Sequence, residues 1–309
     1  MRFYVGITDF DWFSFLSASA PLDEVNFWRP SPGQGFKALD PGGPFLFKLH
    51  SPRNFIAGGG FFSDYVRIPL SYAWNSFGLK NGAHSEREMR IRLAKYREVS
   101  PGSPEDFEIG CILLQSPFFF PEHEWIPASD WPPSVQVGKG YDTAEPRGQA
   151  LWEQVEAWLL AHKSAADLPL EQIEQRVRRG KPQTVYPRLG QGSFRVVVAD
   201  AYQRRCALTG SPVLHVLEAA HVRPVTEDGP NNVQNGILLR QDVHTLFDRG
   251  YITVTPDYRV EVSRRIKDEF ANGKEYYSAH GQMISLPGKS SLHPAGKFLS
   301  WHNDNVYLG

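Results

Sequence analysis

Short apolar runs separated by glycine and proline turns dominate the first half of the chain. The runs are RFYVGI, PFLFKL, NFIAGGGFF, GCILLQ and SVQVG, and turns such as RPSPGQG and DPGGP lie between them. Runs of this kind are typical of the strands of a small β-barrel or curled sheet. Helices are predicted at SYAWNSFG, SEREMRIRLAKYRE and GQALWEQVEAWLLAHK, the last with Leu151, Val155, Trp158 and Leu159 on one face.

The pattern changes after residue 163. Residues 164–192 are polar and charged, contain three prolines and show one helical pattern, so we predict a basic, partly helical linker. Beyond it, FRVVVADAYQRRCALTG predicts a helix, VLHVLEAAHVRPV and NGILLR two strands, and QDVHTLFDRG a short helix that ends at Gly250. The tail from Pro256 predicts one more strand, a short helix and an extended end. We therefore expect an α+β protein with domains at 1–163 and 193–309.

The composition of the chain excludes several classes of protein. The 309 residues are 41% hydrophobic and 13% aromatic, enough to fill real cores, so a disordered chain is excluded. No apolar run approaches the roughly 20 residues of a membrane helix, and the first residues do not resemble a signal peptide. Two cysteines provide neither a disulfide framework nor a four-cysteine zinc site. We expect a cytoplasmic protein with no membrane partner.

Charge is distributed unevenly along the chain. Residues 1–160 hold 14 Lys and Arg against 19 Asp and Glu, whereas residues 161–309 hold 19 against 15. A polyanion such as the DNA backbone would favour the basic half, although solvated charge on a linker explains the same counts. The candidate phosphate contacts are Arg204, Arg205, Arg223 and Arg249.

The most specific chemistry lies in the predicted hairpin and the helix after it. His221 ends the first strand, Asn235 begins the second, and His244 and Asp248 are one helical turn apart. The last two suit a divalent cation, while a neutral His221 could take a proton from water and an asparagine could orient it. This set suits metal-assisted hydrolysis of a phosphodiester. Each residue alone has an ordinary explanation, but the combination in strand–strand–helix order favours the catalytic one.

Residues 194–254 resemble an HNH endonuclease domain. The pattern C-x-x-T-G … E-A-A-H-[IV]-x-P … N-G-I-L-L-x-x-D-x-H-x-L-F-D-x-G is matched from Cys206 to Gly250. The resemblance implies a ββα-metal fold, a nuclease activity and one divalent metal ion per site. Mg²⁺ is the first expectation, with Mn²⁺, Ni²⁺ or Zn²⁺ as alternatives.

The same resemblance implies a role for each site residue. His221 would be the general base, Asn235 its positioner, and His244 and Asp248 would bind the metal. Many HNH nucleases carry a further ligand immediately before the base, where this chain has Ala220. Glu218, two residues earlier on the same face of a strand, is therefore a candidate ligand, and His215 or a phosphate oxygen of the substrate is an alternative.

The aromatic half is expected to provide selectivity. It resembles a PUA-superfamily domain of the EVE or SRA-like kind, and such modules fused to an HNH domain resemble modification-dependent restriction endonucleases. Most aromatics should form the core, but Trp28, Phe61, Asp64 and Trp74 adjoin turns and are candidates for a pocket that holds a flipped base.

We therefore expect a modification-dependent DNA endonuclease of bacterial defence, which flips 5-methyl- or 5-hydroxymethylcytosine into the N-terminal pocket. The alternatives are an HNH nuclease that recognises another modification or RNA, and a reader of modified DNA whose nuclease site is inactive because of Ala220. Since cutting both strands of DNA requires two active sites, a homodimer is expected, at least on DNA.

Overall fold

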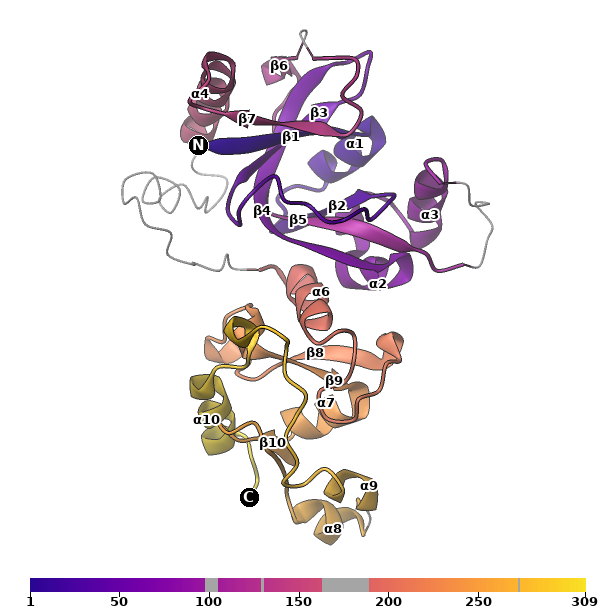
Figure 1. The fold of residues 1–309 in the computed structure, drawn as a ribbon, viewed down its shortest axis with the longest axis vertical. Coiled ribbons are helices and arrows are strands. Elements are labelled where there is room, and N and C mark those ends of the chain that lie inside the picture. Colours follow the sequence, from indigo (N-terminus) through magenta and orange to yellow (C-terminus); the bar gives the residue numbers. More distant parts are fainter. Residues whose placement is uncertain (98–104, 129–130, 163–188, 272) are drawn as a thin grey trace. The chain divides into compact units, whose positions relative to one another are not determined.

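The computed structural model describes residues 1–97, 105–128, 131–162, 189–271 and 273–309 (Figure 1). The chain divides into two compact units, Met1–Pro187 and Arg188–Gly309. Both combine strands with helices, so the α+β class is confirmed. The predicted linker lies outside the described residues except for its last four. Among the helices that are described, none is long and apolar enough to cross a membrane.

One mixed sheet forms the first unit. Its strands are β1 (Arg2–Thr8), β2 (Glu24–Arg29), β3 (Pro44–Leu49), β4 (Phe55–Pro69), β5 (Glu108–Phe119), β6 (Ile126–Pro127) and β7 (Gly138–Asp142). They follow the order β2-β5-β4-β3-β1-β7, with β6 paired to β4. β1 and β3 are parallel, and the other described pairs are antiparallel. Two register shifts between β4 and β5 increase the local bend and twist of the sheet.

Both faces of this sheet are covered by apolar clusters. The α-helices in the described part of the unit are α1 (Phe10–Ala18), α2 (Leu70–Phe77), α3 (Glu86–Ala94) and α4 (Pro146–Ala161), and Figure 1 shows α4 beside β7. Neighbouring residues of β3 point to opposite faces, so Leu46 enters the cluster that contains α4 and Phe47 the cluster that contains α1. The aromatic residues of the N-terminal half therefore mostly form two cores.

Most of the predicted elements of this unit are confirmed, with one exception. SVQVG is not a strand, because the chain turns after Pro132, where Val135 N–H donates to the Pro132 carbonyl at 3.0 Å, and β7 begins only at Gly138. The sequence pattern also missed α1 and β2. Their aromatic residues adjoin polar ones, which obscured the periodicity, yet Trp12 and Phe27 are buried in one core.

The second unit contains the predicted strand–strand–helix motif. Its first elements are α6 (Gln191–Ala201), β8 (Leu217–His221), β9 (Gly236–Arg240) and α7 (Gln241–Asp248). β8 and β9 are antiparallel, with His221 opposite Gly236, and the predicted order is confirmed. Gly250 ends α7 with φ +76, and a Cβ there would lie 2.0 Å from the Val306 carbonyl oxygen, so no larger residue fits.

The tail is more regular than the sequence pattern predicted. After β10 (Ile252–Val254), its described elements are β11 (Val260–Val262), α8 (Arg265–Phe270), α9 (Lys274–Tyr277) and α10 (Gly296–Asn305). The prediction of an extended end was wrong. Helix α10 forms there because Phe298, Leu299 and His302 share one face and are buried together.

A buried histidine connects α10 to α7. The ring of His302 stacks on Phe247 with centroids 3.8 Å apart and planes 15° apart. Its Nε2–H donates to the Phe247 carbonyl at 3.1 Å, and Nδ1 lies 2.8 Å from the Thr253 hydroxyl. Burial lowers the pKa of His302 to about 4, against the opposing effect of the Phe247 carbonyl.

This pKa predicts acid sensitivity of the second unit. Because the folded-state pKa lies below the unfolded value of 6.5, the contribution of neutral His302 is complete above pH 6.5 and is lost as pH falls towards 4. The free energy of unfolding should fall by about 3 kcal/mol over this range of pH. The measurement is the urea midpoint of the full chain at several pH values. The midpoint should fall as pH falls from 6.5 towards 4 in the wild type, and this dependence should be absent in His302→Gln. His123→Gln, at an exposed histidine of the first unit, is the control. An unchanged slope in His302→Gln would contradict the assignment.

Candidate active site

A buried asparagine closes the loop between β8 and β9. Asn235 Oδ1 accepts the Arg223 N–H at 2.9 Å, and Nδ2 donates to the carbonyls of Arg223 and Pro230 at 2.9 and 3.0 Å. None of these bonds reaches the ring of His221. The prediction that Asn235 orients that ring directly is therefore corrected, because its amide binds the backbone of the loop between β8 and β9.

The residue that contacts His221 is Asn231. Nε2 of His221 lies 2.8 Å from Asn231 Oδ1, and the imidazole stacks on Phe194 of α6 with centroids 4.0 Å apart and planes 11° apart. The segment GPNNVQNG offers three asparagines, and residue type alone does not distinguish them. The hydrogen bond and the stacking together fix the orientation of the His221 ring.

The surroundings of His221 favour its neutral form. Burial lowers its pKa below the ordinary 6.5, and the charge of His244 acts in the same direction, while Asn231 and Asp248 oppose them. With Nε2–H donating to Asn231, the neutral ring presents the lone pair of Nδ1. An oriented imidazole that is unprotonated at neutral pH has the properties of a general base.

His244 on α7 lies between two carboxylates. Its Nδ1 is 2.7 Å from Glu218 Oε2 on β8, and its Nε2 is 3.2 Å from Asp248 Oδ2, four residues further along α7. Burial raises the pKa of Asp248 and the nearby Glu218 raises it further, whereas His244 and His221 lower it. The structure therefore brings together four of the residues selected from the sequence.

The donors around His244 fit a divalent cation with an incomplete protein shell. Within the described ranges, no group of three or more His, Cys, Asp or Glu side chains is arranged to hold a metal ion. His244 Nε2 and Asp248 Oδ2, at 3.2 Å, are spaced as neighbouring ligands of an octahedral ion, which are roughly 3 Å apart for bonds of about 2.1 Å. Water and phosphate oxygens commonly complete such shells. Glu218 contacts the other nitrogen of the ring, the one remote from Asp248.

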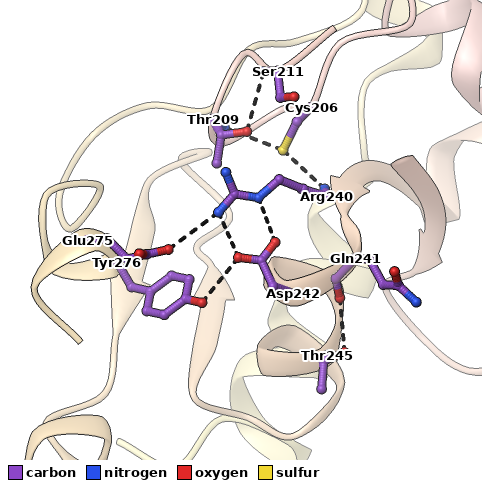
Figure 2. A network of polar contacts seen from close by, with 9 residues as sticks. All are labelled: Cys206, Thr209, Ser211, Arg240, Gln241, Asp242, Thr245, Glu275 and Tyr276. Atoms are coloured by element: carbon purple, nitrogen blue, oxygen red, sulfur yellow. Dashed lines mark hydrogen bonds and ion pairs between the residues drawn. The ribbon is translucent and has the colours of Figure 1, made fainter. Parts of the chain in front are cut away.

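A polar network holds the start of α7 in place (Figure 2). Arg240 Nε and Nη2 each lie 2.6 Å from one carboxylate oxygen of Asp242, and Tyr276 O–H donates to the same carboxylate at 3.1 Å. The hydrogen bond from Arg240 lowers the pKa of Asp242 to about 2. Buried Cys206 accepts the Arg240 N–H at 3.3 Å, so its thiol packs inside the unit. The network fixes the helix that carries His244.

The four candidate phosphate contacts differ in their surroundings. Arg205 and Arg249 are exposed. Arg204 follows α6 with φ +58 and is half-buried. Arg223 Nε donates to the Glu227 carbonyl, and its guanidinium lies 5.5 Å from the ring centroid of Trp301, so it supports the loop. Arg249 directly follows Asp248, at the C-terminal end of α7.

The four residues selected for the base pocket have different surroundings. Phe61 is 2% exposed within the core, so the prediction for this residue was wrong. Asp64 Oδ1 accepts the Tyr65 N–H at 2.7 Å, and Trp74 is half-buried on α2. Trp28 lines a cavity in the described part of the first unit, and its indole N–H donates to the Asn81 carbonyl at 2.9 Å.

That cavity has a volume of about 290 Å³. It lies at the ends of β1, β2 and β3 and beside α1, and its aromatic walls include Trp12, Phe27 and Trp28. Its polar side includes Asp9 and Tyr96, whose hydroxyl contacts the two Asp9 carboxylate oxygens at 3.1 and 3.3 Å. Burial, followed by the Asp9 charge, raises the pKa of Tyr96 to about 12, so Tyr96 is a hydrogen-bond donor.

Asp9 is unusual for its position in the sequence. It precedes α1 as the N-cap residue, where an aspartate normally accepts a backbone N–H of the first turn. Its side chain makes no such bond and instead faces Tyr96 and His50, the latter at 3.9 Å. Asp9 therefore does not cap α1, and its carboxylate is a hydrogen-bond acceptor in an aromatic cavity. Asp9, Tyr96 and His50 were not predicted from the sequence, because they lie far apart along the chain.

The comparisons with known proteins identify the second unit's motif. The family model for HNH endonuclease matches residues 206–255, which include both site histidines. The chain therefore carries an HNH endonuclease domain, and the resemblance inferred from the sequence is confirmed over that range. No curated protein matched the chain.

Solved structures similar to the chain include two proteins. One is described as a modification-dependent TagI restriction endonuclease, with a TM-score of 0.27, 19% identity, and coverage of 42% of each chain. The other is ASCH from Zymomonas mobilis, with a TM-score of 0.32, 12% identity, and coverage of 48% of this chain and 94% of that one. The chain thus spans less than half the length of the restriction endonuclease.

Proposed function

We propose that this protein is a metal-dependent endonuclease that cuts DNA containing a modified cytosine. The observation that carries the nuclease activity is the cluster of His221, Glu218, His244 and Asp248 on one strand–strand–helix motif. The match to HNH endonucleases over residues 206–255 supports the same activity. We place the protein in the cytoplasm, as part of a bacterial defence against foreign DNA.

In this proposal the chain's own residues handle the proton and the substrate. His221 Nδ1 takes a proton from the attacking water, while Asn231 and Phe194 hold the ring in place. His244 and Asp248 hold one divalent cation, Mg²⁺ before Mn²⁺, Ni²⁺ or Zn²⁺, which supplies positive charge to the phosphate and the leaving oxygen. Arg205 and Arg249 contact DNA phosphates, and a homodimer provides one such site for each strand.

The cavity of the first unit is proposed to receive a base extruded from the duplex. Its volume and aromatic walls suit a planar heterocycle, and the Asp9 carboxylate suits the exocyclic amino group of cytosine. Neither a lone carboxylate nor aromatic walls select among substituents at the 5-position, so 5-methyl- and 5-hydroxymethylcytosine are both included. Of the residues expected from the sequence at this pocket, Trp28 lines the cavity, whereas Phe61, Asp64 and Trp74 are not among its lining residues.

A cleavage assay on matched plasmids tests the proposed function. One plasmid is unmodified, one carries 5-methylcytosine and one 5-hydroxymethylcytosine, each with Mg²⁺, Mn²⁺ or Ni²⁺ and with EDTA. We expect metal-dependent cutting of modified DNA only. Equal cutting of all three plasmids would support the nuclease activity and contradict the recognition of a modified cytosine. No cutting with any metal would favour a reader of modified DNA with an inactive nuclease site, consistent with Ala220.

A further inference from the structure

The position of Glu218 differs from that of a metal ligand. Ligands of one ion converge on one point, whereas Glu218 Oε2 and Asp248 Oδ2 approach different nitrogens of the same imidazole. The two nitrogens of an imidazole direct their bonds away from each other. A cation that binds His244 Nε2 and Asp248 therefore lies on the side of the ring away from Glu218.

The two contacts of His244 also differ in what they constrain. Glu218 comes from β8, 26 residues from His244 in sequence, and its 2.7 Å contact fixes the ring across two elements. Asp248 belongs to the same helix as His244, and its side chain is more exposed, at 56% against 36% for Glu218. The closer and better-shielded carboxylate is the one on Nδ1.

The proton of a neutral imidazole resides on one nitrogen only. A carboxylate that accepts at Nδ1 keeps the proton there and leaves a lone pair at Nε2. A lone pair that faces the Asp248 carboxylate at 3.2 Å is repulsive until a cation lies between them. The arrangement at Nδ1 thus prepares the opposite edge of the ring for a metal.

We infer that Glu218 is a positioning residue that orients His244 by accepting its Nδ1–H, so that His244 binds the divalent cation through Nε2 beside Asp248. This inference rests on the proposed function for the identity of the site, and it replaces the expectation that Glu218 is itself a ligand. It also assigns a role to the glutamate although Ala220 occupies the usual ligand position.

Metal affinity distinguishes a positioning residue from a ligand. Co²⁺ binding to the full chain is measured by calorimetry and by its visible absorption in wild type, Glu218→Gln, Glu218→Ala and Asp248→Asn. The glutamine oxygen can still accept the Nδ1–H, so Glu218→Gln should lose less than 10-fold in affinity and Glu218→Ala about 10- to 100-fold. Glu227→Gln, an exposed glutamate of the same unit, should bind Co²⁺ as the wild type does.

Nitrogen NMR provides a readout independent of both affinity and activity. In full-length protein labelled at histidine and loaded with Zn²⁺, His244 should show a protonated Nδ1 and a metal-bound Nε2, with its signals assigned from His244→Asn. Metal at Nδ1 would overturn the inference. So would an equal loss of Co²⁺ affinity in Glu218→Gln and Asp248→Asn, or an absence of Co²⁺ binding in the wild type. Metal binding through Nε2 without any DNA cleavage would instead refute the proposed nuclease and leave the role of Glu218 intact.

Discussion

Replacing His221 by alanine should lower the rate of DNA cleavage by about 10²- to 10⁴-fold, the range typical of losing a general base. The ring is stacked on Phe194 and hydrogen-bonded to Asn231, so the wild-type base is already oriented before substrate binds. The metal donors on α7 are untouched by this change. We therefore expect His221→Ala to bind DNA and Co²⁺ as the wild type does while cleaving slowly.

The pH dependence of cleavage provides a second measurement of the same role. Burial lowers the pKa of His221 below 6.5, so the base form persists to lower pH than that of an exposed histidine. The wild-type rate should fall only below pH 6.5, and His221→Ala should lose this acid limb. His215→Ala, at an exposed histidine of the same unit, is the control for the loss of an imidazole. If His221→Ala retained both the rate and the acid limb, another group would be the base.

The elements around this site were predictable because their information is local. β8 and β9 are indicated by alternating apolar residues and by the turn residues beside them. Helix α7 is indicated by the spacing of His244 and Asp248 and by Gly250 at its end. All of these signals come from residues close in sequence. The choice between Asn231 and Asn235 was not predictable. Both are asparagines of one loop, and only its path shows that Asn235 binds backbone while Asn231 reaches His221.

The residues that line the cavity of the first unit were even less predictable from the sequence. Residues were selected from the sequence because an aromatic or an acid adjoined a turn, and this rule chose Phe61, which the sheet buries. Asp9, His50 and Tyr96 come from three separate segments and meet only through the parallel pairing of β1 with β3 and the position of the chain after α3. Strand pairing over such distances leaves no periodic signal in the sequence.

Replacing Asp9 by asparagine should remove the preference of the protein for a base with an exocyclic amino group. The carboxylate only accepts hydrogen bonds, so it favours the amino group of 5-methylcytosine over the carbonyl of thymine, which is otherwise nearly the same shape. A hydrogen bond to a charged group contributes about 1.5–3 kcal/mol, which corresponds to roughly 10- to 150-fold in affinity. An asparagine amide can also donate a hydrogen bond, so the ratio of the affinities for 5-methylcytosine and thymine should fall towards one.

Binding in EDTA isolates this effect from cleavage. Two duplexes differ at one position, 5-methylcytosine opposite guanine or thymine opposite adenine, and a second pair carries 5-hydroxymethylcytosine or 5-hydroxymethyluracil. Wild type should bind the amino member of each pair more tightly, and Asp9→Asn should not. Asp11→Asn changes the same charge in the first turn of α1 at an exposed residue outside the cavity, and it should retain the wild-type ratio. An unchanged ratio in Asp9→Asn would place base recognition elsewhere, whereas equal binding of all duplexes by the wild type would argue against reading of an extruded cytosine altogether.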